Sequence, residues 1–185
     1  IARRAEHGIE LRVHPTLIPE EQLIANVNGV KNAVLVQAHA VGPTLYYGAG
    51  AGAGPTASAV VADIVDIVRD ISYTEDGAGT IPQLAFEALT DLPILKREEM
   101  TTGYYLRVDA EDQTGVLADI TTILSRAGIS IDAIMQQSRL KDLIPIVILT
   151  DPVVESKMDD AIAKIQALPA IHGEIVRIRL ESLDS

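Results

Sequence analysis

Residues 104–120 read Tyr-Tyr-Leu-Arg-Val-Asp-Ala-Glu-Asp-Gln-Thr-Gly-Val-Leu-Ala-Asp-Ile, and their pattern changes halfway along the stretch. Residues 104–108 are typical of a strand, and residues 109–114 are expected to form an acidic loop. After Gly115, apolar residues recur at helical spacing until Gly128, a residue that favours a helix end. The expected buried stripe of this helix is Val116, Leu117, Ile120, Ile123, Leu124 and Ala127.

Two more strands are predicted directly after this helix. Residues 129–137 and 144–150 have strand-like composition, and a turn is expected between them at 139–142. Because proline cannot donate a hydrogen bond within a sheet, Pro145 is expected at the start of its strand.

A second helix and a last strand complete this part of the chain. The helix is expected to begin at Asp151-Pro152, with the aspartate as its N-cap, and to end at Pro169. Residues 174–180 alternate as a strand, so residues 101–185 have the order βαββαβ, the ferredoxin-like arrangement. Both helices would cover one face of the sheet, so the other face needs a partner and association is expected. The buried stripe of the second helix would be Met158, Ile162, Ile165 and Leu168.

An alternating run, Gly48-Ala49-Gly50-Ala51-Gly52-Ala53-Gly54, precedes a second candidate helix. Apolar spacing predicts that helix over residues 56–71, with Pro55 in its first turn. Free amides at a helix N-terminus favour an anion, which makes the run a candidate ligand loop. The alternative is that its glycines only let the helix pack closely on a sheet.

The glycine run matches known nucleotide-binding motifs only in part. Gly48-x-Gly50-x-x-Ala53 fits the G-x-G-x-x-A form of the dinucleotide fingerprint. A Rossmann unit needs a strand after the helix, however, and residues 72–79 have the composition of a loop. No Gly-Lys-Ser/Thr follows the run, which excludes a P-loop.

The segment before the glycine run is predicted to hold few elements. Residues 9–13 alternate as a strand, and residues 20–25 indicate a short helix. Residues 33–40 and 44–47 indicate an antiparallel pair. So few strands make a poor independent domain, and more sheet is expected upstream.

Composition excludes several classes of protein. The 185 residues are 48% hydrophobic, enough for a core, and the formal charge of −11 argues against a nucleic-acid partner. The chain has no cysteine, and His7, His14, His39 and His172 are scattered, so no metal site is expected. No apolar run approaches the roughly 20 residues of a membrane span, and we expect a cytoplasmic protein without a membrane partner. A first residue of isoleucine rather than methionine indicates a piece of a longer protein.

The C-terminal segment resembles an ACT domain, the amino-acid-sensing module of biosynthetic enzymes. The resemblance rests on Tyr-Tyr-Leu-Arg-Val at 104–108, Asp-Gln-Thr-Gly-Val-Leu-Ala-Asp-Ile at 112–120 and Ala-Gly-Ile-Ser-Ile at 127–131. The family usually has proline where Thr114 stands, a departure that leaves Gly115 in place.

The N-terminal segment resembles the end of the catalytic region of homoserine dehydrogenase. It shares Arg-Val-His-Pro-Thr-Leu-Ile-Pro at 12–19, Asn-Gly-Val-Lys-Asn-Ala-Val at 28–34 and Tyr-Tyr-Gly-Ala-Gly-Ala-Gly at 46–52, followed by Pro55-Thr56-Ala57. The two resemblances imply an α/β (α+β) chain. A partial α/β substrate-domain segment would occupy residues 1–71, a connector 72–100 and a ferredoxin-like ACT domain 101–185.

The homoserine dehydrogenase family uses a nicotinamide cofactor to interconvert aspartate semialdehyde and homoserine, in threonine, methionine and isoleucine biosynthesis. By resemblance, the Rossmann domain, the catalytic lysine and the acidic substrate ligands lie upstream of Ile1, so no catalytic residue is expected in this chain. The resemblance implies that the glycine loop approaches NADP or NAD at the rim of the cofactor site. The expected cofactor-binding residues are Gly48, Gly50, Gly52 and Thr56.

The ACT resemblance implies allosteric sensing of an amino acid and a homo-oligomer formed through this domain. Threonine is the expected effector because the implied reaction lies on its pathway. Amides at Val116, opened by Gly115, would bind its carboxylate, and Asp112 would accept from its ammonium group. Ser130 stands where related modules place a polar contact, often from the neighbouring subunit. The alternative is that residues 109–112 are only a solvated acidic loop before a helix.

Two other functions are compatible with parts of the sequence. The chain could be a non-enzymatic, amino-acid-binding regulatory module, or a purely structural dimerisation domain. Both leave residues 1–71 unexplained, and the sequence therefore favours part of an NAD(P)-dependent enzyme.

Overall fold

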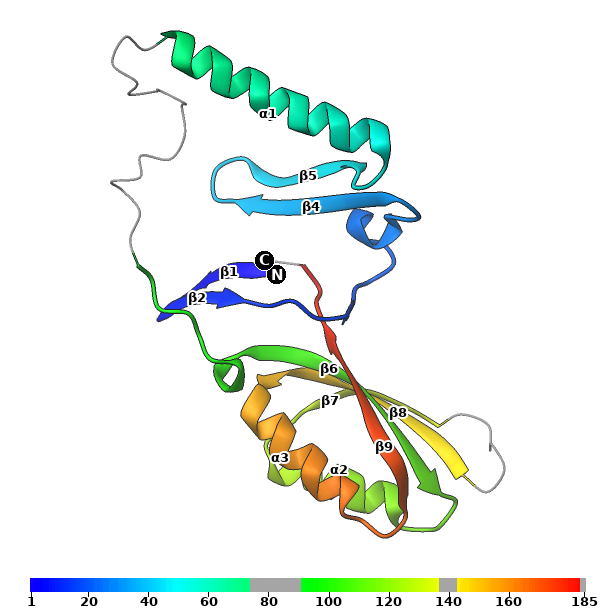
Figure 1. The fold of residues 1–185 in the computed structure, drawn as a ribbon. Helices are drawn as coiled ribbons and strands as arrows, with labels where there is room; N and C mark the ends of the chain where they lie inside the picture. Colours follow the sequence, from blue (N-terminus) through cyan, green and yellow to red (C-terminus); the bar gives the residue numbers. More distant parts are fainter. Residues whose placement is uncertain (74–90, 137–142, 184–185) are drawn as a thin grey trace. The chain divides into compact units, whose positions relative to one another are not determined.

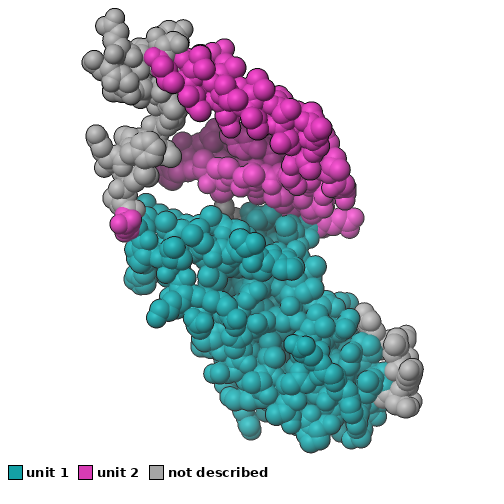
Figure 2. Space-filling view, viewed as in Figure 1, with its two compact units in different colours: residues 1–19, 92–185 teal, residues 20–91 magenta. Residues whose placement is uncertain are grey.

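The computed structural model describes residues 1–73, 91–136 and 143–183, and the chain divides into two compact units. Unit 1 comprises Ile1–Pro19 and Leu92–Ser185, and unit 2 comprises Glu20–Asp91 (Figure 2). The chain therefore leaves unit 1 after its first segment and returns to it later. This division crosses the predicted domain limits, 1–71, 72–100 and 101–185, which remain predictions.

The larger part of unit 1 is an antiparallel sheet with two helices. In chain order its elements are β6 (Thr101–Glu111), α2 (Val116–Arg126), β7 (Ile131–Gln136), β8 (Leu143–Val154), α3 (Glu155–Gln166) and β9 (Ile171–Leu180). The strands lie in the order β9-β6-β8-β7, and neighbouring strands are antiparallel. The predicted βαββαβ fold is confirmed, including the start of α2 at Val116 and the left-handed Gly128 after its end.

Alternation along the strands places the core between the sheet and the helices. Every second residue of the middle of β6 points to α2 and α3, which lie on one face of the sheet (Figure 1). Burying each of these side chains fully contributes roughly 1.5–3 kcal/mol to stability. The side chains with no exposed surface include Tyr104, Leu106, Val108, Ile120, Leu124, Ile148, Met158 and Ile165.

Two predicted boundaries are wrong, at the ends of β6 and β8. Residues 109–111 belong to β6 rather than to an acidic loop. Asp151-Pro152 lies inside β8, and α3 begins at Glu155 with Val154 as its N-cap. β6 and β8 pair at residues 109–111 and again at Val153 and Val154, beyond a register shift at Asp151-Pro152, and this tertiary pairing outweighs the local helix-start signal. The turn predicted at 139–142 lies outside the described residues.

The outer edge of β9 is covered in two places. Strand β3 (Thr16–Leu17) pairs in parallel with Arg179 and Leu180 and makes a fifth strand of the sheet. Farther along β9, the Gln166 side chain donates from Nε2 to the Gly173 carbonyl at 2.6 Å. Its Oε1 atom accepts from the Ile175 N–H at 3.0 Å, so one amide side chain satisfies two backbone groups of β9.

The first residues of unit 1 form a hairpin of β1 (Ala2–Ala5) and β2 (Gly8–Leu11). Strand β2 corresponds to the strand predicted at 9–13, whereas β1 was not anticipated. Through Ile9, β2 also forms a parallel bridge with Ile94, just before the short helix η3 (Arg97–Glu99).

Unit 2 is a hairpin and a long helix. After η1 (Leu23–Asn26), β4 (Lys31–Ala38) and β5 (Gly42–Ala49) form the predicted antiparallel pair, and α1 (Ala53–Tyr73) follows. The short helix predicted at 20–25 is a 3-10 turn. Within residues 20–71, none of the side chains that the structure describes is buried, so this part of unit 2 has no core of its own. No helix in the described residues is long and apolar enough to cross a membrane.

Candidate functional site

The glycine run spans the turn from β5 into α1. Gly48 is the second-last residue of β5 and lies opposite Asn32 on β4. The Gly50 N–H donates to the Val30 carbonyl at 3.2 Å, which extends the ladder past the end of β5. The Thr56 N–H donates to the Gly52 carbonyl at 3.1 Å and closes the first turn of α1. The structure thus brings Gly48, Gly50, Gly52 and Thr56 together in one tight turn.

Different glycines in this turn are needed for different reasons. Gly52 has φ of +121°, a backbone conformation that other residues rarely adopt. Gly50 is not in that region, and a Cβ built on it would lie 1.4 Å from Nδ2 of Asn32. The constraint at Gly50 is therefore the neighbouring Asn32 side chain rather than the backbone conformation. A Cβ at Gly48 or Gly54 would meet no atom within 4 Å.

The predicted effector residues Asp112, Gly115 and Val116 lie in the turn from β6 into α2. Gly115 is the N-cap of α2 with φ of +98°, and its carbonyl accepts from the Asp119 N–H at 2.9 Å. A Cβ on Gly115 would have open space around it, so the first turn of α2 is approachable at this residue. The Val116 N–H donates to the Gln113 carbonyl at 3.5 Å, and the amides that follow it in the first turn have no acceptor within the helix and can bind a carboxylate.

Ser130 lies at the opposite end of the sheet from these three residues. Ile131, which follows it, pairs with Thr150, and Thr150 in turn pairs with Tyr104 near the start of β6. The turn into α2 follows Glu111, seven residues farther along β6, which corresponds to about 20 Å along a strand. Within one chain, the structure therefore does not bring Ser130 to the rest of the predicted site.

A histidine and an acid missed by sequence reasoning fix the strand next to this turn. Glu111 Oε1 lies 2.7 Å from His172 Nε2, and Gln113 Nε2 donates to Glu111 Oε2 at 2.5 Å. Glu111 lies on β6 and His172 on β9. Their separation of 61 residues gave no sequence signal for this contact. Glu111 is therefore held by His172 and Gln113 just before the turn into α2.

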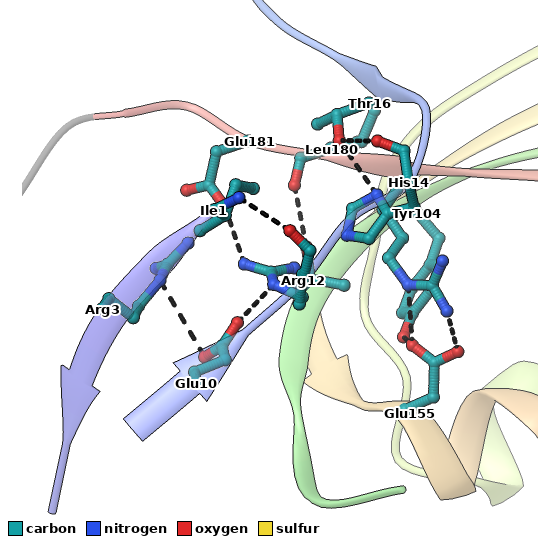
Figure 3. A network of polar contacts seen from close by, with 12 residues as sticks. Ile1, Arg3, Glu10, Arg12, His14, Thr16, Tyr104, Glu155, Leu180 and Glu181 are labelled. Atoms are coloured by element: carbon teal, nitrogen blue, oxygen red, sulfur yellow. Dashed lines mark hydrogen bonds and ion pairs between the residues drawn. The ribbon is translucent and has the colours of Figure 1, made fainter. Parts of the chain in front are cut away.

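A second polar network, centred on Glu155, lies at the N-terminus of α3. The Glu155 side chain has no exposed surface, accepts from the Tyr104 hydroxyl at 2.6 Å, and is bound in a bidentate manner by Arg179. Figure 3 shows the contact between Tyr104 and Glu155. Asp159, one turn later on α3, accepts from Arg97 at 2.6 Å and from Arg177. Three arginines thus surround two carboxylates at the junction of η3, α3 and β9.

The network keeps its carboxylates ionised. Burial by itself raises the pKa of Glu155, but hydrogen bonds from Arg179 and Tyr104 outweigh it and hold the pKa below its ordinary value. Burial likewise opposes ionisation of Asp159, and hydrogen bonds from Arg177 and Arg97 lower its pKa. Burial and the hydrogen bond to Glu155 raise the pKa of the Tyr104 hydroxyl, which stays protonated as a donor. All charges of the network are satisfied within the fold, which indicates a structural role.

Comparisons with known proteins agree with the two resemblances seen in the sequence. Residues 1–65 match the family model of homoserine dehydrogenase, and residues 104–170 match that of the ACT domain. The first match ends within α1, and the second runs from β6 to the end of α3.

Individual relatives match nearly the whole chain. The homoserine dehydrogenase of Pseudomonas aeruginosa is 54% identical over 188 residues, which cover 100% of this chain and 43% of the relative. That of Neisseria gonorrhoeae is 50% identical, over 99% of this chain and 42% of the relative. The crystal structure of a homoserine dehydrogenase from Thiobacillus denitrificans superposes with a TM-score of 0.88 at 58% identity, over 98% of this chain and 41% of that one. The chain thus spans about two fifths of the length of these relatives.

Proposed function

This chain belongs to the homoserine dehydrogenase family, as a C-terminal part of it, and from that premise we propose that it serves an NAD(P)-dependent oxidoreductase. The longer protein would interconvert aspartate semialdehyde and homoserine in threonine, methionine and isoleucine biosynthesis, in the cytoplasm. The observation that carries the proposal is the order of the two matched regions along one chain, with an ACT fold built in full after the homoserine dehydrogenase segment.

In this proposal, the catalytic groups belong to the rest of the longer protein, and unit 2 contributes the rim of its cofactor site. The turn at Gly48–Thr56 would approach NADP or NAD with its backbone. Support comes from the tight turn at Gly52 and from the first turn of α1, whose amides suit a phosphate or a ribose hydroxyl. Asn32 packs against Gly50 and would hold the turn in position.

Unit 1 would supply allosteric regulation by threonine. The effector carboxylate would bind at the start of α2 beside Gly115, and its ammonium group would bind near Asp112. Because Ser130 is far from this turn within one chain, its contact to the effector would come from a second chain.

The same proposal includes a homo-oligomer formed through the ACT domain. The sheet face opposite α2 and α3 is largely apolar, since the register aligns one set of side chains across all four strands. Arg107 is a charged member of this face, and Met135 is 52% exposed on it. A second copy would cover these apolar groups. They include Tyr105, Met135, Leu149, Val176 and Ile178.

The experiment uses the full-length protein. We expect it to oxidise NADPH or NADH with aspartate semialdehyde, and we expect threonine to bind by calorimetry and to inhibit the reaction. Gly115→Leu should abolish threonine binding and keep dehydrogenase activity. Gly42→Leu is the matched control, because Gly42 also has a positive φ and open space around its Cα but lies in unit 2.

Each outcome separates the candidate functions. Threonine binding without dehydrogenase activity would favour the non-enzymatic regulatory module. Activity without threonine binding up to millimolar concentration would reject the effector and leave the enzyme.

A further inference from the structure

Residues 1–19 contact the chain just before it enters the ACT domain and again where it leaves that domain. They belong to the region that matches homoserine dehydrogenase, yet they lie in the same compact unit as the ACT domain. The chain leads into the ACT domain through residues 92–100 and leaves it after Leu180. The first segment is bonded to the chain at each of these points.

The first contact joins β2 to the segment leading into the ACT domain. The Ile9 N–H donates to the Pro93 carbonyl at 2.8 Å, and the Leu95 N–H donates to the Ile9 carbonyl at 2.9 Å. Gly8 makes this approach possible, because a Cβ at that position would lie 2.1 Å from the Pro93 carbonyl oxygen. The leading segment then continues to η3, where Arg97 binds Asp159 of α3.

The second contact joins the first segment to the exit from β9. Beyond the parallel pairing of β3, the Glu181 N–H donates to the Leu17 carbonyl at 3.0 Å. The Glu181 side chain accepts from Arg12 Nη2 at 3.0 Å and also binds Arg3 (Figure 3). The Arg12 side chain is only 2% exposed and also pairs with Glu10, so Arg12 and its two carboxylate partners are largely removed from water, whereas Arg3 is more exposed.

We propose that residues 1–19 form a clamp that unfolds together with the ACT sheet and transmits displacements of that sheet to the catalytic part of the protein. β3 is hydrogen-bonded to β9 and β9 to β6, so this strand of the clamp is itself part of the ACT sheet. A shift of either end of the ACT domain must move the clamp or break its bonds. Breaking them would leave the buried Arg12 without its Glu181 partner, which is unfavourable.

Hydrogen exchange on the full-length protein tests the first half of the proposal. Ile148→Ala removes a fully buried side chain of β8, and its exchange rates are compared with wild type. If the clamp and the sheet open as one unit, the exchange rates of the Ile9, Leu95 and Glu181 amides rise by the same factor as those of β6. We expect this factor to be about tenfold or more. Amides of β4 and β5 serve as the internal control and should not change. Ile148→Val is the milder variant if the first does not fold.

Clamp amides that keep their wild-type exchange rates while those of β6 and β8 accelerate would overturn the proposal. This outcome does not depend on any effector, and it separates the clamp from the regulatory function.

The second half rests on the proposed function and uses threonine as the probe. Glu181→Gln should retain threonine binding by calorimetry and raise the threonine concentration for half-inhibition several-fold. Asp160→Asn is the matched control, since it removes one negative charge from an exposed position on α3, and it should be inhibited as wild type is. Inhibition of Glu181→Gln identical to wild type would overturn transmission through the clamp. A wild-type protein that does not bind threonine contradicts the effector proposed above, and the exchange result then decides the clamp alone.

Discussion

The two units use their apolar residues in opposite ways. In unit 1, apolar side chains from β6, β8, α2 and α3 close on one another, and several have no exposed surface. In unit 2, the apolar residues of α1 remain 39–68% exposed. They are Val60, Val61, Ile64, Val65, Ile67, Val68 and Ile71. One unit carries its own core, and the other carries only one side of a core.

The difference shows what a secondary-structure pattern can and cannot specify. Helix α1 has an apolar face, as α2 does, but a face is buried only when another element covers it. The chain spans 41–43% of the length of the relatives that it matches, and within the described residues the apolar side chains of α1 stay exposed, which accords with that partial span. Stability measurements on this chain should therefore report on unit 1.

The largest expected effect contrasts one core substitution in each unit. In the chain as it stands, Ile148→Ala should lower the free energy of unfolding by about 2–5 kcal/mol, because it leaves a cavity in a packed core. Ile64→Ala should change it by about 0.5 kcal/mol or less, because Ile64 is 54% exposed. Urea titration followed by circular dichroism measures both. Equal losses would show that α1 is packed in solution.

The next effect concerns the buried charges of unit 1. Glu155→Gln should lower the free energy of unfolding by about 3 kcal/mol, because Arg179 loses its buried counter-charge. Asp66→Asn is the matched control in unit 2, where the ion pair with Arg69 is exposed, and it should have little effect. If both variants unfold at the same urea concentration as wild type, the Glu155 network does not stabilise the fold.

The same carboxylates predict a dependence on acid. The pKa values of Glu155 and Asp159 are lowered in the folded protein from ordinary values of 4.5 and 3.8. Their contribution to stability is therefore complete above the ordinary values and is lost as the pH falls through the lowered ones. Thermal unfolding between pH 7 and pH 3 should show a falling Tm in wild type. The fall should be smaller in the double variant Glu155→Gln/Asp159→Asn. Parallel curves of Tm against pH for the two proteins would show that these two carboxylates do not cause the fall.

The smallest expected effect on stability is at the glycine turn of unit 2. In the full-length enzyme, Gly50→Val should raise the cofactor KM more than it lowers Tm, because displacing Asn32 deforms the turn. Gly54→Ala, which adds a methyl group to open space, is the control. A Gly50→Val variant with an unchanged cofactor KM and a lower Tm would show that the turn only packs.

Local signals predicted most of the fold of unit 1. Helix α2 was found where apolar spacing and Gly128 placed it, and the βαββαβ order followed from similar patterns. The prediction was wrong at Asp151-Pro152, where a good local helix start lies inside a strand because β8 has β6 beside it. Local preference loses there to pairing with residues about 50 positions away.

The polar contacts of the candidate sites could not be predicted in the same way. Glu155 and Arg179 are 24 residues apart, and Arg12 and Glu181 are 169 apart. Neither pair therefore produces a periodic pattern in the sequence. Strand β3 has only two residues, too few to show alternation. The effector and cofactor residues were named from resemblance, and their roles stay predictions.

The covered edge of β9 limits how copies of this chain can assemble. A sheet with two open edges can add strands at both sides and grow into a fibre. Here β3 and the Gln166 side chain occupy some backbone groups of β9, so in the described part of this five-stranded sheet β7 is the less obstructed edge for strand addition. If two chains pair through their β7 strands, the open edge of each sheet is occupied, and sheet extension stops at a dimer. Strand β3 and the Gln166 side chain thus disfavour aggregation through the edge of β9.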